Sequence, residues 1–154
     1  MMKSAVLQNR STGEAAVLGL FGGLWAGLVM AGFLLFAIVL GDAGFRDTLA
    51  HFSLPEGTGL WIAALSHLAV SAVYGLVYGL IFAFLAERWS WKISWWLALA
   101  LGAAYGLILW LLAVYILLPG TPYAWHEITP SVLVGAHLVY GLTLGGLIYR
   151  RRYD

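Results

Sequence analysis

The chain has 154 residues, of which 62% are hydrophobic and only 10% are charged. A soluble domain carries roughly 25% charged residues, so this composition excludes the soluble globular class and indicates a membrane protein. The net charge of +1 argues against a nucleic-acid partner, and the absence of cysteine excludes a disulfide, a zinc–thiolate site and an iron–sulfur cluster.

Four long apolar runs follow one another along the chain. Each is near or above the ~20 residues that cross a bilayer as a helix, and backbone groups in lipid must be satisfied within the helix itself. The predicted helices cover residues 15–40, 60–86, 93–118 and 131–149. We therefore expect an all-α integral membrane four-helix bundle, with residues 1–154 as a single transmembrane domain in contact with the lipid bilayer. The short connection between the second and third helices predicts an antiparallel hairpin.

The basic residues indicate how these helices are oriented. Seven of the eight Lys and Arg residues lie on one side of the predicted helices, and only Arg46 lies on the other. The positive-inside rule places the basic side in the cytoplasm. Both termini are therefore predicted to be cytoplasmic.

Small residues recur at intervals of four in every predicted helix. Because residues four apart share a helix face, and membrane helices associate through close packing of small residues, these positions are predicted to be packing faces. They are Gly19, Gly23 and Gly27 in the first helix, Ser71, Gly75 and Gly79 in the second, Gly102 and Gly106 in the third, and Gly141 and Gly145 in the fourth. Alternatively, some of these glycines clear space for a flat cofactor or a lipid, and spacing alone does not separate the two.

A weak internal repeat relates the two halves of the chain. GLWAGLVM from Gly23 aligns with GAAYGLIL from Gly102, and the second and fourth helices align when His67 and His137 are superposed. Helices one and two then correspond to helices three and four in the same orientation, as in a parallel duplication. Sequences composed of few apolar residue types also match each other by chance. The sequence therefore leaves both duplication and chance similarity open.

His67 and His137 are the histidines inside the predicted helices; His67 lies seven residues after Leu60 and His137 seven residues after Pro130. At 1.5 Å per residue, both rings lie roughly 10 Å below the outer end of helices that run in the same direction. Tyr74 and Tyr140 roughly share the faces of these histidines and are predicted to make polar contacts. An ionisable group inside a bilayer is costly, so the pair is the candidate functional site.

Three interpretations of the pair are considered. In the first, each neutral imidazole hydrogen-bonds a polar side chain or a carbonyl across the bundle. In the second, His67 and His137 are the axial ligands of a haem b that the glycines admit. In the third, they form a proton or metal site near the outer mouth, which no pattern of metal ligands on one helix face supports. We favour the first, so neither a cofactor nor a metal ion is expected.

Part of the chain resembles the YagU-type family of uncharacterised bacterial inner-membrane proteins. The similar segments are SHLAVSAVYGLVYGLIFAFLAERW and LLPGTPYAWHEITPSVLVGAHLVYGLTLGGLIYRRR, with the family's Pro-Gly-Thr-Pro-like turn, HLV helix and basic tail. The resemblance covers about the last 90 residues. It implies a multi-pass protein of the bacterial inner (cytoplasmic) membrane and supplies no activity.

No nucleophile motif, phosphate-binding loop or intramembrane carboxylate occurs in the sequence, so we expect no enzyme activity. The leading hypothesis is a non-catalytic accessory subunit that packs in a larger respiratory or photosynthetic membrane complex, with other membrane subunits as partners. The first alternative is a haem b electron-transfer subunit that uses His67 and His137. The second is a small transporter or channel.

Overall fold

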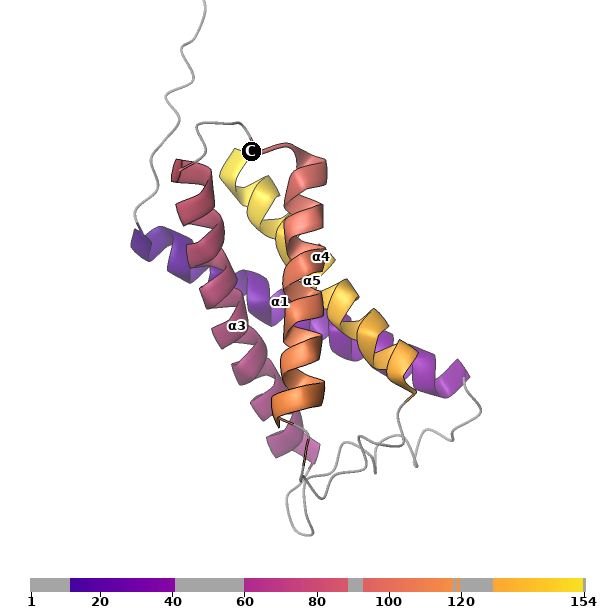
Figure 1. The fold of residues 1–154 in the computed structure, drawn as a ribbon. Coiled ribbons are helices and arrows are strands. Elements are labelled where there is room, and N and C mark those ends of the chain that lie inside the picture. Colours follow the sequence, from indigo (N-terminus) through magenta and orange to yellow (C-terminus); the bar gives the residue numbers. More distant parts are fainter. Residues whose placement is uncertain (1–11, 41–59, 89–92, 118, 120–128, 154) are drawn as a thin grey trace, which may run out of the picture.

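The computed structural model describes residues 12–40, 60–88, 93–117, 119 and 129–153. These residues form four helices and, in this part of the chain, no strand (Figure 1). The helices are α1 (Thr12–Leu40), α3 (Leu60–Arg88), α4 (Trp95–Leu112) and α5 (Pro130–Tyr153), and α4 continues into a π-helical turn, η1 (Ala113–Leu117). The predicted all-α four-helix bundle is confirmed.

All four helices are long and apolar enough to cross a membrane, over residues 12–37, 64–88, 95–117 and 130–152. Their outward-facing side chains are mostly large and apolar. Trp25, Phe84 and Ile108, on three different helices, are 60–66% exposed. An apolar surface on every side of the bundle suits a hydrocarbon solvent, so fold and composition together define a multi-pass membrane protein. Which end faces the cytoplasm stays a prediction.

The helix ends differ from the predicted bounds for identifiable reasons. The side chain of Ser94 accepts a hydrogen bond from the Leu97 N–H at 3.2 Å, and this cap starts α4 at Trp95 rather than at residue 93. Helix α5 begins at Pro130, where the missing amide donor costs nothing. It ends at Tyr153, four residues beyond the predicted 149, because its last turn includes the basic tail.

In the pair formed by α1 and α3, the two backbones lie against each other with no side chain between them. A Cβ added to Gly75 would overlap the carbonyl oxygen of Gly19, and one added to Gly23 would overlap that of Ser71. The partners run in opposite order along the two helices, so α1 and α3 are antiparallel. We call this row of close contacts between small residues the α1–α3 ladder. Gly27 and Gly79 lie at its two ends, against Ser71 and Gly19 respectively.

Helices α4 and α5 form a second ladder of the same kind. A Cβ on Gly102 would overlap the carbonyl oxygen of Gly141, and one on Gly106 would overlap that of His137. Gly145 lies against Ala98 and Gly102. Close approach of this kind is how small residues hold membrane helices together.

The two ladders share one register. Gly23 contacts Ser71 and Gly75 in the first ladder just as Gly102 contacts Gly141 and Gly145 in the second. These are the residues that the sequence repeat aligns, since superposing the two histidines also superposes Ser71 on Gly141. The bundle therefore consists of two helical hairpins, α1–α3 and α4–α5, with equivalent internal packing.

The hairpins meet closely along α1 and α5, and close backbone contacts link the described helices in the order α3, α1, α5, α4. At the α1–α5 contact the fully buried Leu144 and the buried Ile148 lie against Gly22. Leu144 and Ile148 belong to the same apolar core as Ala26 and Phe82. The core thus lies where the two hairpins cross.

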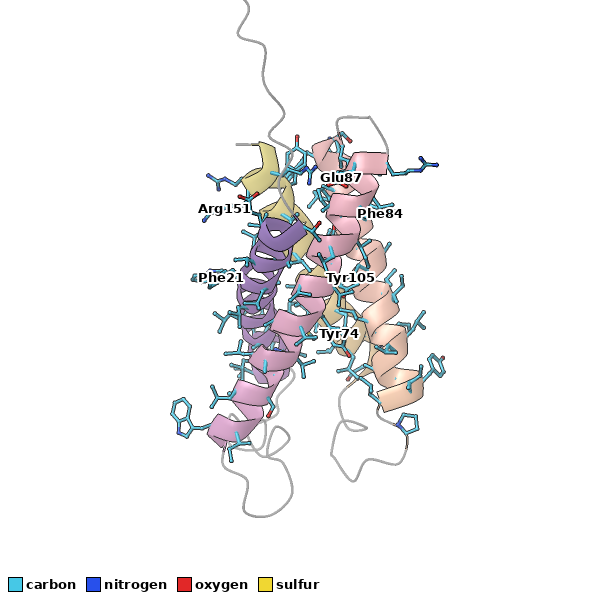
Figure 2. The ribbon with its side chains drawn as sticks, turned by 90° about the vertical axis from the view of Figure 1, so that its left-hand side faces the viewer. Phe21, Tyr74, Phe84, Glu87, Tyr105 and Arg151 are labelled. Carbon is cyan, nitrogen blue, oxygen red and sulfur yellow. The ribbon has the colours of Figure 1, made fainter. Side chains whose placement is uncertain are left out.

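Helices α3 and α4 are antiparallel as predicted, but they are not packed as a tight hairpin. Aromatic rings separate them: the ring centroids of Tyr78 and Tyr105 are 5.0 Å apart. The Tyr105 hydroxyl donates to the Tyr74 carbonyl at 2.8 Å, and the Tyr78 hydroxyl to the Ala98 carbonyl at 3.4 Å. Beyond these tyrosines, toward the end at which α3 begins, the two helices diverge (Figure 2).

Candidate functional site: the histidine cavity

A cavity of about 150 Å³ lies where α3 and α4 diverge, and all four helices contribute to its wall. The structure brings together here both candidate histidines and both candidate tyrosines. Its polar lining consists of His67, Ser71, Tyr74, His137 and Tyr140, and the rest of the wall is apolar. We call this space the histidine cavity.

The cavity is positioned by the two glycine ladders. Gly106 lies against the backbone of His137, and Gly27 lies against the side chain of Ser71, one turn from His67. Both histidines therefore stand at the same end of their ladders, one on α3 and the other on α5. Because these helices run in the same direction, the two rings reach one cavity from different sides.

His137 bonds to its own helix. Its Nδ1 lies 2.8 Å from the Leu133 carbonyl oxygen, one turn earlier in α5. A carbonyl only accepts hydrogen bonds, so Nδ1 carries the proton, and in the neutral ring Nε2 then has a lone pair. Since Nδ1 faces the backbone of α5, the Nε2 atom on the far side of the ring is directed away from that helix.

His67 bonds across the bundle instead. Its Nε2 lies 3.2 Å from the Gly27 carbonyl oxygen of α1, so Nε2 carries the proton and donates. Among the partners considered from the sequence, the structure thus supplies a backbone carbonyl to both rings. Only the bond of His67 joins two helices.

Tyrosine hydroxyls complete the polar contacts around the cavity. The Tyr140 hydroxyl donates to the Ser71 carbonyl at 2.7 Å, which joins α5 to α3. Tyr74 takes part through its carbonyl, which accepts the bond from Tyr105. Sequence reasoning did not select Tyr78 or Tyr105. The signal available was the four-residue spacing of Tyr74 and Tyr78, which puts two aromatic rings on one face of α3.

The π-helical turn η1 was not predicted either, and it borders the cavity. Ala113 and Leu117, its first and last residues, both line the wall. The Ala113 N–H is shared between the carbonyls of Leu109 and Trp110, which marks the point where the α-helical pattern changes. π-Helical turns are rare, and those that occur are often at functional sites. This turn contains no proline that would have indicated it in the sequence.

The residues present do not fit a haem b. The cavity volume of about 150 Å³ is half the lower end of the ~300–1,000 Å³ typical of small-molecule sites, and a porphyrin macrocycle needs more room. The bond of His67 Nε2 to Gly27 also leaves only Nδ1, the nitrogen nearer its own backbone, for an iron atom. No group of three or more His, Cys, Asp or Glu side chains suited to a metal ion occurs in the part of the chain that the structure describes.

Comparison of the chain with family models, with curated proteins and with solved structures gives no match. The fold and the site define the class of protein: a four-helix membrane protein with a small cavity, lined by polar and apolar side chains, between its helices. The resemblance to the YagU-type family stays a prediction.

Proposed function

We propose that this protein is a non-catalytic accessory subunit that binds a transmembrane helix of a larger membrane complex at the gap between α3 and α4. The observation that carries the proposal is the His137 ring, bonded through Nδ1 to its own helix, in a cavity that reaches the surface of the bundle. Val70 and Leu117, two of the apolar lining residues, are each 51% exposed. The cavity thus has a side that faces the membrane.

A polar atom next to lipid hydrocarbon is unfavourable unless a partner group satisfies it. A neighbouring helix that presents a Ser, Thr, Asn or Gln side chain at the depth of His137 supplies a donor, and such bonds between membrane helices contribute about 0.6 kcal/mol on average and up to about 1.7. The remaining apolar wall of the cavity then packs against that helix. The glycine ladders support this role because they hold the two hairpins, and with them the gap, in a fixed shape.

Site-specific cross-linking in native membranes tests the proposal, because the chain has no cysteine and each introduced cysteine is unique. Val70→Cys and Leu117→Cys, modified with a photoreactive maleimide, place the probe at the gap. Val29→Cys on α1, 45% exposed and outside the cavity, is the matched control. We expect one discrete heteromeric product from both gap positions and none from the control.

The mass of the gently extracted complex provides the second measurement. The chain alone has a mass of 16.7 kDa, and the proposal requires a larger, heteromeric assembly by native mass spectrometry. A lone monomer in native extracts, together with identical cross-linking from Val70→Cys and Val29→Cys, would refute the accessory role.

A further inference from the structure

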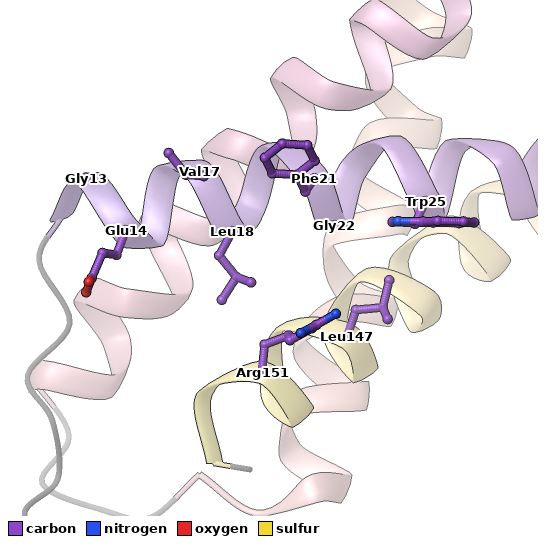
Figure 3. A pocket seen from close by; sticks show the side chains of 9 residues that line it. All are labelled: Gly13, Glu14, Val17, Leu18, Phe21, Gly22, Trp25, Leu147 and Arg151. Carbon is purple, nitrogen blue, oxygen red and sulfur yellow. The ribbon is translucent and has the colours of Figure 1, made fainter.

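A second hollow lies on the other side of the bundle, between α1 and α5, at the end where α5 terminates in Arg150–Arg152 (Figure 3). We call it the α1–α5 groove. It has a volume of about 880 Å³, within the ~300–1,000 Å³ typical of ligand sites. Leu18, Trp25 and Leu147 form part of an apolar wall, and Glu14 and Arg151 lie at the end near the helix termini.

The length of the groove along α1 is similar to the hydrocarbon thickness of one membrane leaflet. Glu14, Leu18 and Trp25 follow each other at helical spacing on one face of α1. From Glu14 to Trp25 the helix advances eleven residues, or about 16 Å, which is about half of the ~30 Å hydrocarbon core. Along α1, which crosses the other helices obliquely (Figure 1), the groove thus extends from the charged helix ends for about the length of one acyl chain.

The charges at its mouth favour an anionic group. Arg151 of α5 and Glu14 of α1 are the charged residues that line the groove, and Arg150 and Arg152 flank Arg151 in the last turn of α5. Arg151 reaches over the groove from α5, and Glu14 extends toward the same side from α1 (Figure 3). Arginine forms strong, directed hydrogen bonds with phosphate, and basic pockets between membrane helices bind anionic lipid headgroups.

We propose that the α1–α5 groove binds one anionic phospholipid, with an acyl chain along the wall from Leu18 to Trp25 and the phosphate at Arg151. Gly22 lines the groove at the contact with α5, where an added Cβ would meet the side chain of Leu144. This site is independent of the histidine cavity, on which the accessory role rests.

Native mass spectrometry of the full chain in detergent, with phosphatidylglycerol or phosphatidylcholine added at equal concentration, tests the proposal. We expect phosphatidylglycerol adducts to persist at activation energies that remove phosphatidylcholine. Arg151→Gln should weaken phosphatidylglycerol binding about fivefold, which corresponds to the ~1 kcal/mol that a basic residue contributes near a membrane surface. Arg150→Gln removes the same charge outside the groove and should weaken phosphatidylglycerol binding less than Arg151→Gln does, because only Arg151 lines the groove.

A second pair of variants tests the apolar part of the groove. Val17→Trp places a large ring in the groove from a position that is 56% exposed, so the core is not disturbed, and it should remove the adduct. Val29→Trp, 45% exposed on the same helix outside the groove, should retain it. Binding that is equal for both lipids and indifferent to Arg151→Gln and Val17→Trp would overturn the proposal.

Two further outcomes would also overturn it. Competition by inorganic phosphate alone at equal concentration would assign Arg151 to a free anion instead of a lipid. A dimer of the chain that disappears in Val17→Trp and forms without added lipid would assign the groove to a second copy.

Discussion

Substitution of Gly75 by alanine is the most direct test of the glycine ladders. The added Cβ would overlap the carbonyl oxygen of Gly19 and the Cα of Gly23, whereas ordinary contact begins at 3.4 Å. Both obstacles are backbone atoms, so α1 and α3 must move apart by about 1 Å, a gap that forfeits up to half of the dispersion energy of each contact. Overpacking of this kind costs ~1–3 kcal/mol, and the better helix propensity of alanine returns up to about 1 kcal/mol.

We therefore expect Gly75→Ala to have a free energy of unfolding about 1–3 kcal/mol below that of Gly32→Ala, which gains the same helix propensity without the overlap. The assay is SDS titration of the purified protein in mixed micelles, followed by circular dichroism. Gly32→Ala is the matched control, because nothing lies within 4 Å of a Cβ at this exposed glycine of α1. Gly145→Ala, at the equivalent point of the second ladder, should behave like Gly75→Ala because its Cβ would overlap the backbone of Ala98. Equal stability of the Gly75→Ala and Gly32→Ala proteins would refute the packing argument.

Three other predictions concern the tyrosines, the site and the topology. Tyr105→Phe should lower the free energy of unfolding by about 0.6 kcal/mol and at most ~1.7 kcal/mol. Tyr115, which is 70% exposed, is the control, and Tyr115→Phe should leave this free energy unchanged. Equal effects of the two substitutions in SDS titration would contradict a role for the Tyr105 hydroxyl. His137→Phe should reduce the heteromeric cross-link from the gap between α3 and α4, since one bond of about 0.6–1.7 kcal/mol is lost. An unchanged cross-link would exclude the ring nitrogen from the interface. Thr129→Cys should react with an impermeant maleimide on intact cells, and Tyr153→Cys should react only after permeabilisation, as the positive-inside rule requires. The reverse pattern of labelling would show the opposite orientation in the membrane.

Much of the fold follows from hydrophobicity and residue size. Apolar runs of sufficient length define the four helices, since backbone groups in lipid leave no other solution. The ten small residues chosen by their spacing of four all lie in the α1–α3 or the α4–α5 ladder. Spacing alone did not indicate which helix each ladder meets, because any two such faces can pack against each other.

The details of the site depend on features that the sequence does not display. The depth of His67 and His137 follows from counting residues, and both do line one cavity. Their bonding partners are backbone carbonyls, which every residue carries and which no sequence motif marks. The divergence of α3 from α4 depends on the bulk of tyrosine rings such as Tyr105, and the π-helical turn arises within an unbroken apolar run.

The shared register of the two ladders has a consequence for how such a chain is built into a membrane. Each hairpin contains an even number of spans, so the second hairpin starts on the same side as the first and each can insert as a self-contained unit. The two hairpins have equivalent contacts inside them, but the two sides on which they meet differ. The pairing is tight along α1 and α5 and open along α3 and α4. This difference makes the bundle asymmetric. The gap between α3 and α4 is the side on which a neighbouring helix can pack.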